Sequence, residues 1–178
     1  YDGERVKVEY PENRFLSAAC SEANGELTVK TTSKFRWFNF GSLFRPIPEA
    51  VISVPKGSEL NLDFTVNAGT VDIAEGTYGD IGISINAGTV NLNDTICGKF
   101  SAKLNAGTLN TGKLTAATAD CVVNAGLIKM DDVACGKFIG KVNAGKIDLS
   151  KLKCDDIMLN LDAGNIEIKV DGIKSDYT

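Results

Sequence analysis

One tripeptide recurs along this chain at a constant interval. Asn-Ala-Gly begins at residues 67, 86, 105, 124 and 143, and Asp-Ala-Gly begins at residue 162, so six copies follow at a step of 19 residues without insertion or deletion. A fixed period over several copies is the signature of a repeat protein, in which each unit packs on its neighbours. Each 19-residue unit must therefore form one complete layer of the fold, and the following units repeat that layer.

Apolar and polar residues alternate within each unit. Residues 71–73 are Val-Asp-Ile, and residues 81–85 place Ile at every second position. A period of two is typical of strands with one buried face. Each unit is thus expected to be strand, turn, strand, turn, with no room for a helix.

Two other repeat folds fit less well. A leucine-rich repeat has a helical or irregular second half, and the calcium-binding nonapeptide roll needs a Gly- and Asp-rich signature that this sequence lacks. The pattern favours an all-β parallel β-solenoid, or β-helix, in which each 19-residue unit is one coil stacked on the next.

The repeated corner has a physical explanation. Its Gly permits a positive φ that a Cβ would resist, and stacked Asn side chains can pass amide hydrogen bonds from coil to coil. In the last copy Asp162 replaces Asn, and a carboxylate can only accept. We therefore expect a structural ladder that Asp162 ends and that consists of Asn67, Asn86, Asn105, Asn124 and Asn143.

The N-terminal part of the chain follows the repeat less closely. Residues 48–66 fit the frame without the corner tripeptide, with Ile52 among the residues expected to be buried, and residues 23–29 contain a corner-like Ala-Asn-Gly. We predict one domain over residues 1–178. Residues 48–178 are expected to form regular coils, and residues 1–47 to form degenerate N-terminal strands of the same solenoid with an irregular cap region.

An aromatic segment interrupts this N-terminal region. It holds four of the eight Phe and the only Trp, and it is expected either to cover the open end of the solenoid or to bind a partner. We favour the lid, because an exposed patch of that size lowers solubility. The candidate cap or interaction residues are Phe35, Arg36, Trp37, Phe38, Phe40, Phe44 and Arg45.

The order of these segments resembles a known family. Val-Lys-Val-Glu-Tyr at 6–10, Gly-Glu-Leu-Thr-Val-Lys at 25–30, the aromatic insertion, residues 50–60 and the repeated corners are similar to a bacterial adhesin family of β-solenoid domains of unknown function. The resemblance implies a right-handed, single-domain solenoid, often carried behind a membrane-anchoring segment. Adhesion is what has been proposed for that family.

Charge and hydropathy limit the partners. A formal net charge of −4 and a pI near 4.9 argue against nucleic-acid binding, which needs a basic face. The sequence holds no apolar run of about 18 residues, so we expect membrane anchoring only through a segment outside this sequence. The chain begins at Tyr1 without Met, which suggests that residues precede it in the natural protein.

Five cysteines occur, at positions 20, 97, 121, 135 and 154. Cys97, Cys135 and Cys154 share one column of the repeat, with Ala116 in the fourth place. We expect buried free thiols, because the count is odd and neither a CxxC motif nor His is present. A Cys135–Cys154 disulfide and a metal or redox site are the alternatives.

Catalytic candidates are few. Without His, a Ser or Cys nucleophile lacks its usual base, and no phosphate-binding GxxxxGKS loop is present. The pairs Asp131 with Asp132 and Asp155 with Asp156 would converge only in a loop. Glu75 and Asp94 share an outward column where calcium is conceivable, although a solvated charge ladder is the favoured interpretation.

We therefore expect no enzyme activity, no cofactor and no metal. The favoured function is a non-catalytic scaffold at the cell envelope or cell surface, outside the cytoplasm, that interacts with an unknown protein or glycan ligand. The alternatives are an envelope sensor or regulatory module and, less favoured, a carbohydrate-active β-helix enzyme, whose fold is shared by lyases and glycosidases.

Overall fold

The computed structural model describes residues 7–9, 16–23, 26–33, 51–53 and 60–170 of the chain. The chain divides into two compact units, Tyr1–Lys56 and Gly57–Thr178. The described residues form strands and turns, and no helix occurs among them. The prediction of an all-β chain is confirmed.

The described strands of the first unit pair antiparallel. β1 (Lys7–Glu9) pairs with β4 (Val51–Ser53), and β2 (Leu16–Ala23) pairs with β3 (Glu26–Ser33) along its whole length. Only residues 24 and 25 separate β2 from β3, which is the length of a hairpin connection. This pairing differs from the parallel solenoid start expected for residues 1–47.

The expected burial of Ile52 is wrong. Ile52 lies opposite Val8 in the β1–β4 pair and is 42% exposed. The predicted burial assumes a parallel coil strand at this position, whereas β4 pairs antiparallel with β1.

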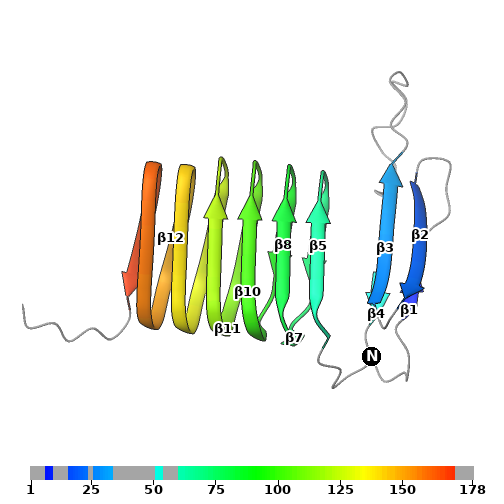
Figure 1. Cartoon of the computed structure of the whole chain (residues 1–178), viewed down its shortest axis with the longest axis horizontal. Helices are drawn as coiled ribbons and strands as arrows, with labels where there is room; N and C mark the ends of the chain where they lie inside the picture. The colour runs from blue at the N-terminus through cyan, green and yellow to red at the C-terminus, as the bar shows by residue number, and fades with distance from the viewer. Residues whose placement is uncertain (1–6, 10–15, 24–25, 34–50, 54–59, 171–178) are drawn as a thin grey trace, which may run out of the picture. The chain divides into compact units, whose positions relative to one another are not determined.

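The second unit is a parallel β-solenoid in which each coil takes 19 residues (Figure 1). Paired residues on neighbouring coils are one repeat apart, so that Ile81 lies between Leu62 and Phe100. This confirms the predicted coil length. The strands are β5 (Leu62–Val66), β6 (Thr70–Ile73), β7 (Gly76–Thr77), β8 (Ile81–Ile85), β9 (Thr89–Leu92), β10 (Thr95–Leu104), β11 (Thr108–Val123) and β12 (Leu127–Val170).

Each coil contributes to three columns of paired strands. β5, β8 and the second half of β10 form one column, β6, β9 and the first part of β11 form another, and β7 pairs with the start of β10 in the third. The 44 residues of β12 exceed two repeat lengths, so β12 winds through successive coils rather than forming one straight strand. The columns enclose the interior of the solenoid.

The core is filled by complementary side-chain sizes. Fully buried Phe100 and Phe138 are separated in their column by Ala119, which is the smaller residue of the intervening coil. A Cβ on Gly140 would approach the Phe138 ring at 3.1 Å, so this glycine leaves the space that the ring needs. The small residues Ala119 and Gly140 thus leave room for the two rings and keep this part of the core closely packed.

The last described coil leaves its apolar columns open. Ile157, Leu159 and Leu161 continue the columns that bury Phe138, Gly140 and Val142, yet they are 39%, 46% and 47% exposed. No later coil lies over them among the described residues. This end of the solenoid is therefore held more weakly than its middle.

Candidate functional site

The corner Asn side chains are joined by hydrogen bonds. Each Asn after the first donates through Nδ2 to Oδ1 of the Asn one coil earlier, over distances of 2.6 to 2.7 Å. Backbone bonds run beside this ladder, for example from Asn105 N to Ile85 O at 2.8 Å. The structure therefore brings together the whole predicted set, Asn67, Asn86, Asn105, Asn124 and Asn143.

The ladder has a defined end. Asn143 Oδ1 is buried and has no hydrogen-bond partner among the described residues. The next coil places Asp162 in this column, and an ionised carboxylate has no proton to donate. A buried acceptor without a donor destabilises the folded state.

A second polar column runs along β6, β9 and β11. Asn91 Nδ2 donates to Asp72 Oδ1 at 2.7 Å, and Asn110 Nδ2 donates to Asn91 Oδ1 at 2.9 Å. These residues are not among the site residues predicted from the sequence. The sequence feature that could have identified them is a polar residue between two residues of the buried face, which recurs once in every unit.

Threonines flank this second column. Strand alternation directs Thr70, Thr89 and Thr108 to the same outward side as the Asx residues two positions later. We call these six residues the Thr-Asx face: Thr70, Asp72, Thr89, Asn91, Thr108 and Asn110. The face offers hydroxyls in one regular column and the Asp72 carboxylate with two amides in the other.

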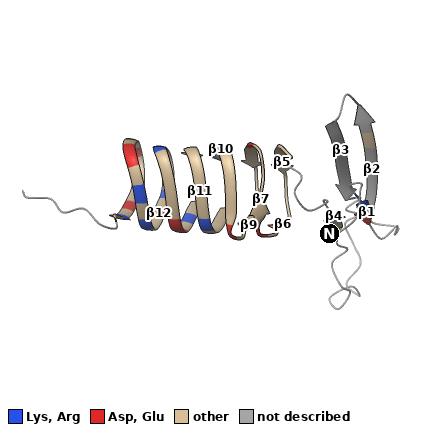
Figure 2. Ribbon diagram, turned by 90° about the horizontal axis from the view of Figure 1, so that it is seen from below, with Lys and Arg blue, Asp and Glu red and all other residues tan. Residues whose placement is uncertain are grey.

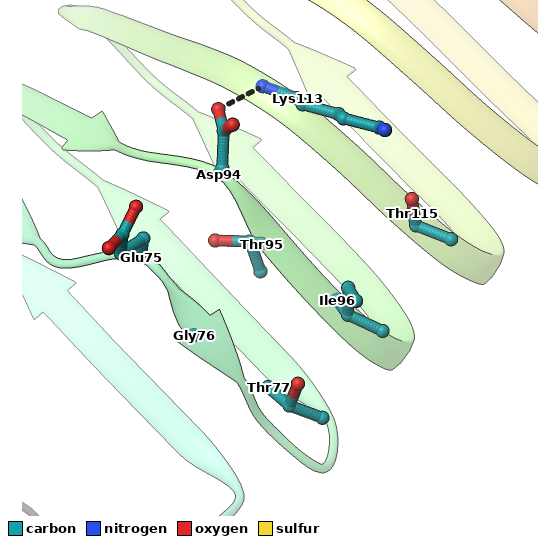
Figure 3. A pocket seen from close by; sticks show the side chains of 8 residues that line it. All are labelled: Glu75, Gly76, Thr77, Asp94, Thr95, Ile96, Lys113 and Thr115. Carbon is teal, nitrogen blue, oxygen red and sulfur yellow. Dashed lines mark hydrogen bonds between the residues drawn. The ribbon is translucent and has the colours of Figure 1, made fainter.

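A hollow of about 450 Å³ lies over the third strand column (Figure 3). Glu75 and Asp94 come from successive coils at one side of it, and Ile96, which is 54% exposed, lies at the other. The lining residues are Glu75, Gly76, Thr77, Asp94, Thr95, Ile96, Lys113 and Thr115.

The charges in this hollow are arranged differently from a salt-bridged ladder. The backbone N of Lys113 donates to Asp94 Oδ1 at 3.0 Å, while the Lys113 side chain extends away from that carboxylate. Buried Thr95 donates to Asn93 O at 2.8 Å, so its hydroxyl is satisfied locally. Asp94 thus shapes the turn through one of its two carboxylate oxygens.

The described residues contain no group of three or more His, Cys, Asp or Glu side chains that could hold a metal ion. Glu75 and Asp94 supply two carboxylates, whereas calcium takes six or more oxygen ligands. The pair alone does not make a calcium site.

The consecutive acidic pairs lie on the surface. Asp131, Asp155 and Asp156 are exposed, and Asp132 is partly exposed. The Asp156 carboxylate is 2.8 Å from Lys137 Nζ in an exposed ion pair. Neither pair lines the hollow over the third strand column.

Charged positions are densest on β12 (Figure 2). Lys146 Nζ lies between the Asp148 and Glu167 carboxylates, at 2.9 and 3.1 Å. The hydrogen bond from Lys146 lowers the pKa of the Asp148 carboxyl, and the same contacts raise the pKa of Lys146. Such solvent-accessible pairs contribute little to stability.

The four cysteines whose side chains the structure describes, Cys97, Cys121, Cys135 and Cys154, are free thiols. Cys97 and Cys121 are buried as predicted, and burial raises the pKa of both, that of Cys97 to about 11. Cys135 and Cys154 are only partly buried, so the expectation of burial is wrong for them. Their sulfur atoms lie 3.3 Å apart on adjacent coils.

The aromatic segment lies outside the described residues. The candidate cap or interaction residues all fall within residues 34–50, so both the lid and the partner site stay predictions.

A family model described as Toastrack DUF4097 matches residues 2–178, which is nearly the whole chain. The chain belongs to the Toastrack DUF4097 family. This Toastrack match confirms the prediction of a domain family of unknown function. Searches of curated proteins and of solved structures give no match. Among the described residues of this Toastrack chain, no helix is long and apolar enough to cross a membrane.

Proposed function

We propose that this Toastrack domain is a non-catalytic, adhesin-like scaffold of the bacterial cell envelope that binds a glycan through the Thr-Asx face. The observation that carries the proposal is the second polar column, in which Asp72, Asn91 and Asn110 are fixed by hydrogen bonds from coil to coil. The family resemblance and the all-β solenoid support a role in display rather than catalysis.

The chemistry of the face suits a sugar. An amide has two N–H donors and two acceptor lone pairs, and the ladder uses one donor and one acceptor of Asn91. The remaining donor and lone pair are free for a ligand. Sugar hydroxyls both donate and accept, so they can pair with these amides and with the neighbouring threonines.

The spacing of the face also favours an extended ligand. Neighbouring coils repeat at about 4.8 Å, so equivalent groups recur along the stack at a fixed interval. Because the ladder holds the side chains in place before binding, little side-chain freedom is lost on association. A repetitive polymer can then contact several coils at once.

Titration calorimetry against soluble bacterial envelope glycans, including peptidoglycan fragments, tests the proposal. Asn91→Lys should lower affinity at least tenfold, because it removes the central amide and places a long side chain on the face. Ser84→Lys, on the outward side of β8, is the matched control and should bind like the native protein. Absence of binding to every glycan, or equal binding by both variants, would contradict the proposal.

A further inference from the structure

We propose that Cys135 and Cys154 form a reversible disulfide that joins two adjacent coils of the solenoid and responds to low-molecular-weight disulfides such as oxidised glutathione. The inference is independent of the glycan-binding proposal. It rests on two neighbouring thiols that the glycan-binding proposal does not use.

Position and distance distinguish this pair from the other described thiols. Cys135 Sγ and Cys154 Sγ are 3.3 Å apart, and both side chains are partly exposed. Cys97 faces Ala116 on the next coil, and Cys121 is fully buried. Among the described cysteines, only Cys135 and Cys154 combine a close partner with access to a small reagent.

The two sulfurs differ in their surroundings. Cys135 donates to Cys154 Sγ at 3.3 Å, whereas Cys154 Sγ donates to the backbone oxygen of Asp156 at 3.0 Å. Burial, followed by the Cys154 contact, raises the pKa of Cys135 to about 12, so Cys135 keeps its proton at neutral pH. Cys154 is therefore the first nucleophile and Cys135 the resolving thiol.

The exchange balances in two steps. The Cys154 thiolate attacks one sulfur of oxidised glutathione, forms a mixed disulfide and releases one glutathione thiolate. Cys135 then loses its proton to solvent and attacks Cys154 Sγ, which releases the second glutathione. The protein gives up two protons and two electrons, and the reagent's S–S bond is reduced to two thiols.

The strand geometry makes this disulfide easy to reduce. Adjacent coils bring Cα atoms within disulfide range, but in-register parallel side chains point the same way, whereas a disulfide prefers a torsion near 90°. Strained and accessible disulfides are the labile ones. The bond is thus suited to a switch rather than to a permanent crosslink.

The crosslink lies next to the weakest part of the described solenoid. Cys154 lies shortly before Ile157, Leu159 and Leu161, which continue the apolar columns but are exposed. Oxidation ties their coil to the preceding one and should limit its opening.

The test incubates the whole reduced chain at neutral pH with oxidised glutathione, followed by acid quenching, alkylation and mass spectrometry. The expected product is the Cys135–Cys154 peptide pair, which a tenfold excess of reduced glutathione reverses. The melting temperature should rise by about 5 °C on oxidation. Amide exchange of residues 157–161 should slow at the same time.

Two variants separate the roles. Cys135→Ser should trap glutathione on Cys154, and Cys154→Ser should leave Cys135 without glutathione; circular dichroism checks that both are folded. Cys97→Ser is the control and should keep the crosslink. Failure of the folded native protein to form the crosslink would overturn the proposal, and glutathione trapped on Cys135 in Cys154→Ser would overturn the assignment of the nucleophile.

Discussion

At the scale of single residues, one amide serves two neighbours. Asn105 donates to Asn86 and accepts from Asn124, so each interior Asn of the ladder is paired in both directions. Asn105 is exposed, however, and an exposed amide hydrogen bond contributes only about 1 kcal/mol or less. The ladder therefore fixes the register of the corners more than it adds stability.

The defect at the end of the ladder gives the first prediction. Asp162→Asn should raise the free energy of unfolding by about 1 kcal/mol, because the new amide could donate to the unpaired Asn143 Oδ1. Chemical denaturation measures the change. The control is Asn165→Ala, three residues later, whose side chain has no partner among the described residues. A lower stability for Asp162→Asn would show that Asn143 Oδ1 is satisfied in another way.

The buried thiols predict a loss of stability at alkaline pH. In the unfolded chain Cys97 ionises near its ordinary pKa of 9.0, whereas burial and the nearby Asp80 raise the pKa to about 11 in the folded chain. Between these values the folded state binds more protons, so the free energy of unfolding falls as the pH rises. Cys97→Ala should show a shallower fall than the native protein between pH 9 and 11.

Alanine is a matched substitute at this position. The next coil already carries Ala116 opposite Cys97. Denaturant midpoints of the native protein and Cys97→Ala, measured at several pH values, show how steeply the stability of each falls with pH. Equal slopes would mean that Cys97 does not keep its proton in the folded chain.

At the scale of the element, the corner between two strands depends on its glycine. Gly107 has a φ of +144°, and a Cβ there would lie 2.5 Å from Gly88 O and 2.9 Å from the Ile85 side chain. Both the backbone conformation and the close approach of the previous coil thus require glycine. Gly69 has a φ of +109° but no atom within 4 Å of such a Cβ.

These two glycines separate strain from crowding. Gly69→Ala should lower the free energy of unfolding by about 1 to 2 kcal/mol, through its positive φ alone. Gly107→Ala should lower it clearly more, because the added methyl group also meets Gly88 O. Thermal or chemical unfolding of both variants gives the comparison. Equal losses would indicate that the corners relax around an added methyl group.

The strands also show which parts of the fold can be predicted from the sequence and which cannot. The constant step between corners is enough to predict the parallel register and the Asn ladder, because every equivalent position meets its copy on the next coil. The β2–β3 pair escapes prediction, because alternation with period two is the same in parallel and antiparallel strands. The Asn24-Gly25 dipeptide is the available signal, since Asn-Gly favours two-residue hairpins, but the same dipeptide also fits a degenerate corner.

The hollow was predictable only in part. The shared column of Glu75 and Asp94 followed from the repeat. Asp94 accepts a hydrogen bond from the Lys113 backbone N and not from the Lys113 ammonium group. This pairing depends on turn geometry, which residue spacing does not specify.

At the scale of the whole molecule, the solenoid is a stack of nearly equivalent units. Each coil contacts its neighbours through the same three strand columns, and the core runs without interruption from Val66 to Leu152. In such an array stability is approximately a sum of unit and interface terms. A complete unit should therefore be removable without loss of the fold, while a fraction of a unit should not.

Deletion of residues 105–123 tests this central claim most directly. The cut removes one whole repeat unit and joins Leu104 to Asn124, so every column and the Asn ladder stay in register. The shortened protein should unfold cooperatively with an unchanged β-type circular dichroism spectrum, and at a lower midpoint than the native chain. Deletion of residues 105–122 is the control and should fail to fold, because one extra residue shifts every following side chain to the opposite face. Equal folding of the two deletions, or failure of the whole-unit deletion to fold, would contradict the solenoid of equivalent coils.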